Sequence, residues 1–123
     1  MTTTVSDETQ ISNVVQNYCS AISNQDWDRA KSYCVYDSQI YFDTCALEEQ
    51  VNNLSQHAST ITISYSITIS NIEINADYAE VSLRRKTLII TMDDYSQRHD
   101  IPGGIIYLQK IDNSWKICDP PGY

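Results

Sequence analysis

The sequence predicts an α+β domain in which three helices cover the concave face of a curved antiparallel sheet. Residues 60–75 alternate between apolar and polar side chains, strictly as far as Ser70, and residues 78–92 return after a short turn. This pattern is typical of a long antiparallel hairpin with one buried face. The alternation slips by one residue at Ser70 and Asn71, which predicts a bulge or a sharp bend. Helical patterns precede the hairpin, and helices gathered ahead of a meander favour packing on one face of the sheet.

Three helices are expected before the hairpin. Ser6 is a suitable N-cap for the first, whose apolar residues recur at helical spacing: Ile11, Val14, Val15, Tyr18, Cys19 and Ile22. Asp26 caps a second helix, which ends before Ser38. Residues 39–42 are predicted as a short strand, and Asp43 or Thr44 as the cap of a third helix. The apolar stripe of that helix comprises Leu47, Val51, Leu54 and Ala58.

Four strands are expected after the third helix. The first has one apolar face, formed by Ile61, Ile63, Tyr65, Ile67 and Ile69, and one polar face, formed by Thr62, Ser64, Ser66 and Thr68. After the second strand, residues 93–97 form a polar turn. A third strand covers residues 101–111, and its Pro102 and paired glycines suit an edge or a bulge. Residues 112–114 turn into a closing strand over residues 115–118.

Composition limits the function classes. The 123 residues form one domain, 1–123, with a formal net charge of −8 that disfavours binding to nucleic acid or to anionic lipid. No apolar run reaches the ~18 residues that span a membrane. The first residues lack the basic and apolar regions of a signal peptide, so a cytoplasmic location is expected. The four cysteines are widely spaced, which favours free thiols, and we expect no metal site and no cofactor.

Three stretches resemble a known family. They are Tyr18 with residues 24–27, residues 37–43, and the closing turn with Trp-Lys-Ile in residues 110–117. With them, residues 11–118 resemble the nuclear-transport-factor-2-like superfamily of cone-shaped (cystatin-like) α+β domains, which includes ketosteroid isomerases, scytalone dehydratase and polyketide cyclases. The resemblance implies a fold and leaves the activity open, because this fold hosts enzymes, binding modules and assembly domains.

The resemblance also implies site residues. Asp43 falls where ketosteroid isomerases carry their general base, and Tyr18 where they carry the tyrosine that donates to the substrate oxygen. Such a pair suits proton abstraction beside a carbonyl. The isomerases' second, protonated carboxylate has no counterpart in residues 103–107, where Tyr107 is a substitute hydroxyl. His57 is a second acid/base candidate, as in the dehydratases.

Each of these residues also has a structural alternative. Asp43 suits a helix N-cap, Tyr18 a core position with a satisfied hydroxyl, and His57 a solvated helix end. Regular alternation places Arg85 on the face of the buried residues Val81 and Leu83. Arg85 is therefore either a pocket cation that orients an acidic or phenolic substrate or a partner in cross-strand pairing.

Two functions follow as hypotheses. The first is a small-molecule lyase, isomerase or cyclase that uses cofactor-free acid/base chemistry on a hydrophobic or phenolic molecule in a closed cavity, with Asp43 as base and Tyr18 as donor. The alternative is a non-catalytic binding or assembly module of the same fold. Either is expected to be a homodimer, because the serine and threonine face of residues 60–68 carries no large charges.

Overall fold

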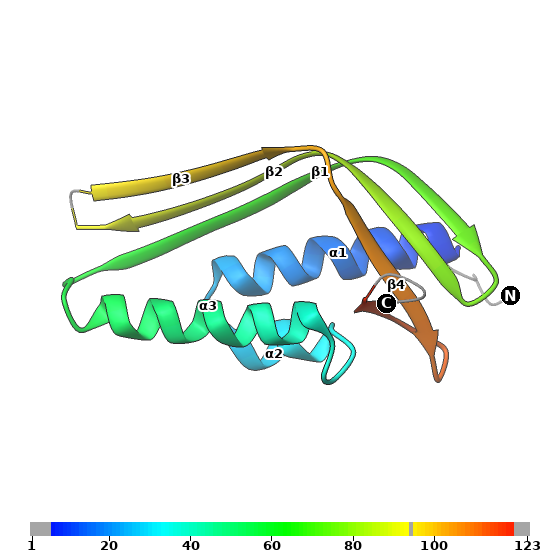
Figure 1. Ribbon diagram of the computed structural model, residues 1–123, viewed down its shortest axis with the longest axis horizontal. Helices are drawn as coiled ribbons and strands as arrows, with labels where there is room; N and C mark the ends of the chain where they lie inside the picture. Colours follow the sequence, from blue (N-terminus) through cyan, green and yellow to red (C-terminus); the bar gives the residue numbers. More distant parts are fainter. Residues whose placement is uncertain (1–5, 94, 120–123) are drawn as a thin grey trace, which may run out of the picture.

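The computed structural model describes residues 6–93 and 95–119. Its elements, in chain order, are α1 (Asp7–Ser23), α2 (Trp27–Ser32), α3 (Gln39–Ser55), β1 (Ile61–Asn75), β2 (Tyr78–Met92), β3 (Tyr95–Pro102), β4 (Ile105–Ile111) and β5 (Ser114–Cys118). The three helices lie together on the concave side of one strongly curled antiparallel sheet (Figure 1). The predicted fold class is confirmed.

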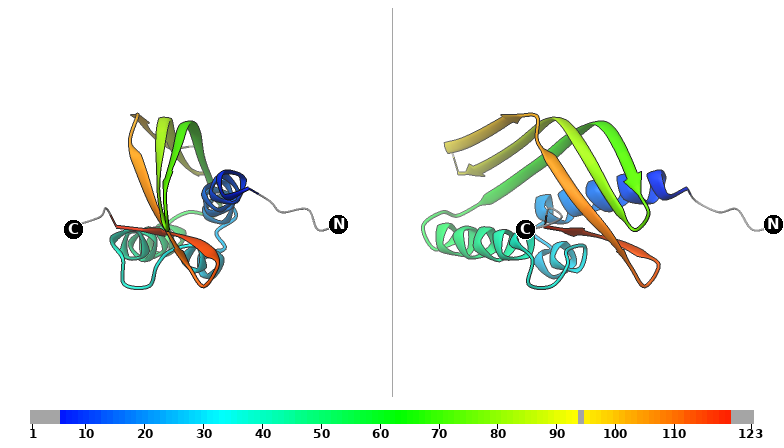
Figure 2. Two further views of the ribbon diagram at one scale, coloured as in Figure 1. Left: turned by 90° about the vertical axis from the view of Figure 1, so that its right-hand side faces the viewer. Right: turned by 45° about the vertical axis from the view of Figure 1, so that its right-hand side comes forward.

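The sheet has the order β1-β2-β4-β5, and β3 also pairs with β2. β4 pairs with residues 78–82 of β2, and β3 pairs with residues 85–92, so β3 and β4 follow one another along the same strand. Figure 2 shows the long strands curling into β4 and β5, which come back beside the helices.

The single strand predicted over residues 101–111 is therefore two strands. Gly103 and Gly104, with φ angles of 85° and 122°, interrupt it in a region open mainly to glycine. The polar turn predicted for residues 93–97 is also wrong, because β3 begins at Tyr95, while residue 94 lies outside the described part of the chain. Ser96 and Gln97, two of the polar residues that suggested a turn, belong to a mostly exposed strand that pairs with β2 in the described part of the sheet.

The predicted bulge is confirmed, and it has a counterpart on the partner strand. In the β1–β2 register, Thr68 pairs with Arg85, Ile69 with Leu83, and Asn71 with Ser82. Ser70 on β1 and Arg84 on β2 are therefore both left out of the ladder. Each strand carries one extra residue, and the hairpin bends there.

The residues of the first strand keep their predicted faces. Ile63 and Ile67 are buried and Ile61, Tyr65 and Ile69 are half-buried, whereas the serines and threonines between them are exposed. The core lies between this face and the helices. Its fully buried large side chains are Ile11, Val15, Ile22, Val51, Val81, Ile90 and Leu108.

The strand predicted for residues 39–42 is wrong, because these residues form the first turn of α3. Ser38 caps this helix, its Oγ accepting a hydrogen bond from the Tyr41 amide at 3.3 Å. Neither Asp43 nor Thr44 is the cap, since both lie inside the helix. The Asp119 carboxylate accepts a second bond, 2.8 Å, from the Gln39 amide and satisfies another free donor of the first turn.

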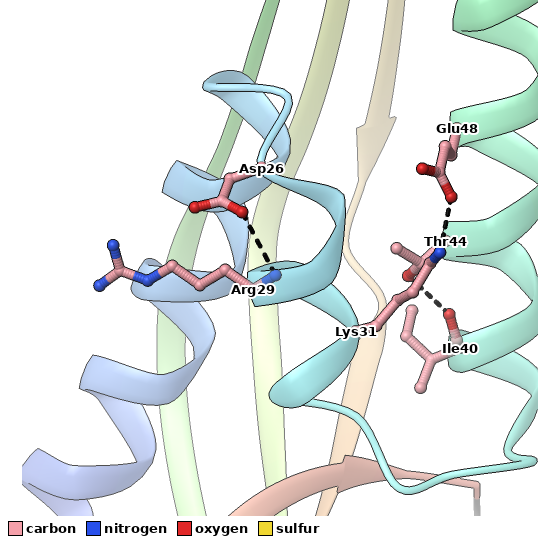
Figure 3. A network of polar contacts seen from close by, with 6 residues as sticks. All are labelled: Asp26, Arg29, Lys31, Ile40, Thr44 and Glu48. Atoms are coloured by element: carbon pink, nitrogen blue, oxygen red, sulfur yellow. Dashed lines mark hydrogen bonds and ion pairs between the residues drawn. The ribbon is translucent and has the colours of Figure 1, made fainter.

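Polar contacts connect the helices. Asp26 caps α2 by accepting from the Arg29 amide at 3.4 Å, and Lys31 of α2 forms an ion pair of 2.6 Å with Glu48 of α3 (Figure 3). Among the helices of the described residues, none is both long and apolar enough to cross a membrane.

Candidate functional site

Five side chains with hydrogen-bonding or ionisable groups meet on the concave side of the sheet. This concave cluster comprises Tyr18 and Cys19 of α1, Thr44 of α3, Tyr65 of β1 and Lys86 of β2. The rings of Tyr18 and Tyr65 lie edge to face, with centroids 6.2 Å apart. Three helical residues and two strand residues thus form one contact group inside the curled sheet.

Tyr18 is held by a chain of two hydrogen bonds. Its hydroxyl lies 2.7 Å from Thr44 Oγ1, and Thr44 Oγ1 donates to the Ile40 carbonyl at 2.8 Å, a bond drawn in Figure 3. Because the threonine hydroxyl has one hydrogen and gives it to Ile40, the Tyr18 hydroxyl must donate to Thr44. Burial raises the pKa of Tyr18 well above its ordinary value, so the phenol stays protonated.

Lys86 is the cation of the concave cluster. Its side chain is half-buried, and its Nζ lies 5.9 Å from the centroid of the Tyr65 ring, a cation–π arrangement. Within the described ranges, no carboxylate lies close enough to form an ion pair with it. Burial raises the pKa of the Cys19 thiol to about 12, and the charge of Lys86 opposes that rise. Lys86 is therefore a partly desolvated cation with no anionic partner among the described residues.

The bulge determines which cation faces the helices. Regular alternation would send Arg85 inward with Leu83. The extra residue, Arg84, reverses the phase, so Lys86, paired with buried Ile67, takes the inward position. Arg85 is exposed and lies on the opposite face beside Thr68, and its predicted inward position is wrong. The phase slip visible at Ser70 indicates an extra residue on β1 alone, and the matching extra residue on β2 is evident only from the pairing of the two strands.

Asp43 does not lie inside the cone. It is exposed, and its Oδ1 accepts a hydrogen bond of 2.9 Å from the Gln39 side chain one turn earlier on α3. Successive residues of a helix point about 100° apart, and the inward position next to Tyr18 belongs to Thr44. The expected pairing of Asp43 with the Tyr18 hydroxyl is therefore wrong. Thr44 was not predicted as a site residue, because the third helix was expected to begin at residue 43 or 44 and it begins at Gln39. Thr44 precedes Val51 by two helical turns and lies on the same stripe.

The other two predicted site residues lie elsewhere. His57 follows the end of α3, is exposed, and its amide donates to the Leu54 carbonyl at 3.0 Å. Tyr107 pairs with Glu80 and alternates with Leu108, which is fully buried, so the Tyr107 side chain lies on the opposite face of the sheet. Of the five predicted residues, only Tyr18 belongs to the concave cluster.

Four hollows on the surface, of about 670, 610, 440 and 420 Å³, offer space outside this cluster. Neither Asp43 nor Tyr18 lines any of them. In the part of the chain that the structure describes, no group of three or more histidine, cysteine, aspartate or glutamate side chains is arranged to hold a metal ion.

Comparisons with known proteins identify the fold. No family model matches the sequence. No curated protein matches it either. Solved structures do: an NTF2-like protein with a cystatin-like fold from Novosphingobium aromaticivorans has a TM-score of 0.68 at 11% identity, over 90% of this chain and 77% of that one.

Two further structures show the same likeness. The beta subunit of benzoate 1,2-dioxygenase from Burkholderia mallei has a TM-score of 0.65 at 14% identity, over 94% of this chain and 88% of that one. A protein from Xanthomonas campestris, provisionally described as a polyketide cyclase, has a TM-score of 0.53 at 12% identity, over 92% and 90%. At these identities the likeness concerns the fold. The chain therefore has the NTF2-like fold, as its resemblance implied.

Proposed function

We propose that this chain is a small-molecule binding module that holds an acidic or phenolic aromatic compound against the concave cluster. The observation that carries the proposal is Lys86, a half-buried cation that stands over the Tyr65 ring without a carboxylate partner in the described ranges. A cation removed from water is costly unless an anion or hydrogen-bond acceptor compensates it. A ligand carboxylate or phenolate supplies that partner.

The surroundings of Lys86 favour an aromatic ligand. Tyr65 and Tyr18 already meet edge to face, an arrangement that another ring can extend. The neighbouring inward positions of β1 and β2 are apolar, namely Ile63, Ile67, Leu88 and Ile90. Two structural neighbours are a subunit of a benzoate 1,2-dioxygenase and a protein provisionally described as a polyketide cyclase, which supports the choice of aromatic acids as first probes.

Calorimetric titration tests the proposal. Benzoate and salicylate are titrated into the wild-type chain and into Lys86→Gln, which removes the charge and keeps most of the side chain. We expect saturable binding to the wild type and at least about tenfold weaker binding to the variant, the loss expected of one charge-assisted hydrogen bond. Lys116→Gln is the matched control, because Lys116 donates to the Ser32 carbonyl away from the concave cluster. Equal affinity in all three proteins would refute the role of Lys86.

A second candidate is an acid/base enzyme of the isomerase, lyase or cyclase type. The observation that favours it is Tyr18, a buried phenol whose raised pKa keeps it able to donate to an enolate oxygen. Asp43, one residue from Thr44, serves as base only if its side chain turns inward from Gln39. Deuterium exchange beside the carbonyl of α-tetralone, followed by NMR, tests this. The candidate requires exchange above background that Asp43→Asn abolishes.

We further propose that the protein works in the cytoplasm as a homodimer. The exposed face of β1 carries Thr62, Ser64 and Ser66 without a large charge among them, so a second copy meets no desolvated ion there.

A further inference from the structure

We propose that Arg84 and Arg85 form a binding site for a multiply charged oxyanion, on the convex side of the sheet where the hairpin bends. Both residues line a hollow of about 440 Å³ together with Thr68 and Pro102. This site is separate from the concave cluster and does not depend on the proposed function of that cluster. The chemical class it fits is a phosphate or a polycarboxylate.

The bulge brings the two arginines together. On a regular strand, successive side chains point to opposite faces. Arg84 is the extra residue of β2, and a bulge places its two consecutive residues against one residue of the partner strand. Both arginines therefore line one hollow, while Lys86 faces the helices. The run of three cations is divided between two sites on opposite faces.

Among residues 6–93 and 95–119, no side chain is paired with either guanidinium. In the described ranges, Arg84 and Arg85 form no ion pair and no side-chain hydrogen bond. Hydrogen bonds from Arg98 and Thr87 are the main causes that lower the pKa of Asp100, and the charge of Arg85 adds to them from beyond ion-pair distance. Oδ1 accepts from Thr87 at 2.7 Å, and Oδ2 accepts from Arg98 at 2.6 Å. Two adjacent cations thus remain available in a chain whose net charge is −8.

The hollow is shaped by fixed backbone. The Gly103 amide donates to the Arg84 carbonyl at 3.1 Å, and the Leu83 amide donates to the Gly104 carbonyl at 2.9 Å. These bonds hold the extra residue against the link between β3 and β4. Thr68, opposite Arg85 in the ladder, adds a hydroxyl. Planar guanidinium groups donate in pairs to oxyanions, so two of them beside a hydroxyl match an anion with several oxygens.

The test uses two probes, pyrophosphate and citrate, titrated into the full chain while NMR follows the Nε–H signals of the arginine side chains. We expect saturable shifts of Arg84 and Arg85 with at least one probe, and at least about tenfold weaker binding in Arg84→Gln and in Arg85→Gln. Saturation by pyrophosphate alone identifies a phosphate site, and saturation by citrate alone identifies a polycarboxylate site. Arg84→Lys and Arg85→Lys keep the charge but lose the planar guanidinium group that donates two parallel hydrogen bonds. We therefore expect an affinity between those of the wild type and of the glutamine variants.

Two controls make the proposal refutable. Arg29→Gln removes an arginine of α2 whose Nε donates to the Tyr33 hydroxyl at 3.2 Å, on the helical side of the sheet, and it should leave the affinity unchanged. Lys86→Gln should also leave it unchanged, which separates this site from the concave cluster. Shifts that grow linearly with probe concentration at every arginine would overturn the proposal, because they indicate ionic screening alone. Arg84 and Arg85 signals that respond to protein concentration and not to either probe would overturn it too, and would assign the arginines to a contact between two copies.

Discussion

Thr44 decides what Tyr18 can do. The Thr44 hydroxyl donates a hydrogen bond to the Ile40 carbonyl, and its oxygen accepts one from the Tyr18 hydroxyl. The phenol therefore already has an acceptor in the absence of a ligand. The Tyr18 side chain is only 5% exposed. As the structure stands, Tyr18 is a core tyrosine with a satisfied hydroxyl, the structural alternative that the sequence left open, and donation to a ligand requires this hydrogen bond to break.

The direction of this hydrogen bond makes two substitutions unequal. Thr44→Val leaves the buried Tyr18 hydroxyl without an acceptor, which costs about 1–3 kcal/mol of unfolding free energy. Tyr18→Phe removes the donor itself, and Thr44 keeps its bond to Ile40, so the cost is closer to about 1 kcal/mol. Denaturant unfolding of both variants measures the difference. Valine has nearly the same shape as threonine, so the loss in Thr44→Val reports on the hydroxyl and not on a change of volume. A larger loss in Tyr18→Phe than in Thr44→Val would contradict the assigned direction.

At the scale of secondary structure, β2 explains why one site residue was predicted on the wrong face. The alternation of β1 revealed the slip at Ser70, because apolar and polar residues there differ clearly. On β2 the extra residue falls within Arg84, Arg85 and Lys86, three cations that carry no apolar contrast. The position of the bulge on β2 is fixed by pairing with β1 and by the Gly103 amide, contacts that a single strand's pattern does not contain.

The beginning of α3 shows a second limit of sequence patterns. Ile40, Tyr41 and Phe42 are β-branched or aromatic, and local preference favours a strand. The helix forms because Ser38 caps it and because Asp119, 80 residues away in sequence, accepts from the Gln39 amide. The cap is a local signal, whereas the contact with Asp119 exists only after β5 has closed the sheet. Because the helix was expected to begin later than Gln39, Asp43 was predicted as a cap and Thr44 was not predicted to face the core.

Asp93 connects two loops and predicts a pH dependence. Its carboxylate accepts from the amides of Thr60 and Ser59 and from the Thr60 hydroxyl, and these bonds lower its pKa. A carboxylate whose pKa is lowered in the folded state adds stability above its unfolded pKa, ordinarily about 3.9, and that stability is lost as pH falls through the folded pKa. Between about pH 5 and pH 2, the unfolding free energy of the wild type should therefore fall more than that of Asp93→Asn.

Urea denaturation at a series of pH values measures this difference. Asp93→Asn keeps the shape of the side chain but does not titrate, so its stability curve should be flatter at acidic pH. Parallel curves for the two proteins, separated by a constant amount, would show that the contacts of Asp93 do not favour its charged form.

On the scale of the whole molecule, the two faces of the sheet differ in chemistry. The concave face presents isoleucines, Tyr65 and Lys86 to the helices. The convex face presents serines and threonines from β1, and Thr87 with the Arg98–Asp100 ion pair from β2 and β3. This division was predicted from the alternation of β1, because the side-chain period of a strand is two. The partner of the convex face could not be predicted in this way, because a polar face is typical both of a solvated surface and of a wet interface.

The last prediction concerns that partner. If the convex face binds a second copy, light scattering at micromolar concentration should give twice the 14.0 kDa of one chain. Ser66→Glu introduces a charge in the middle of the exposed row of β1, and an unpaired charge in an interface is costly, so this variant should be monomeric. Ser20→Glu adds the same charge to the exposed side of α1 and should remain dimeric.

Since each chain carries a net charge of −8, added salt should strengthen the dimer by screening repulsion between the copies. A wild-type mass of 14.0 kDa at every salt concentration would rule the homodimer out.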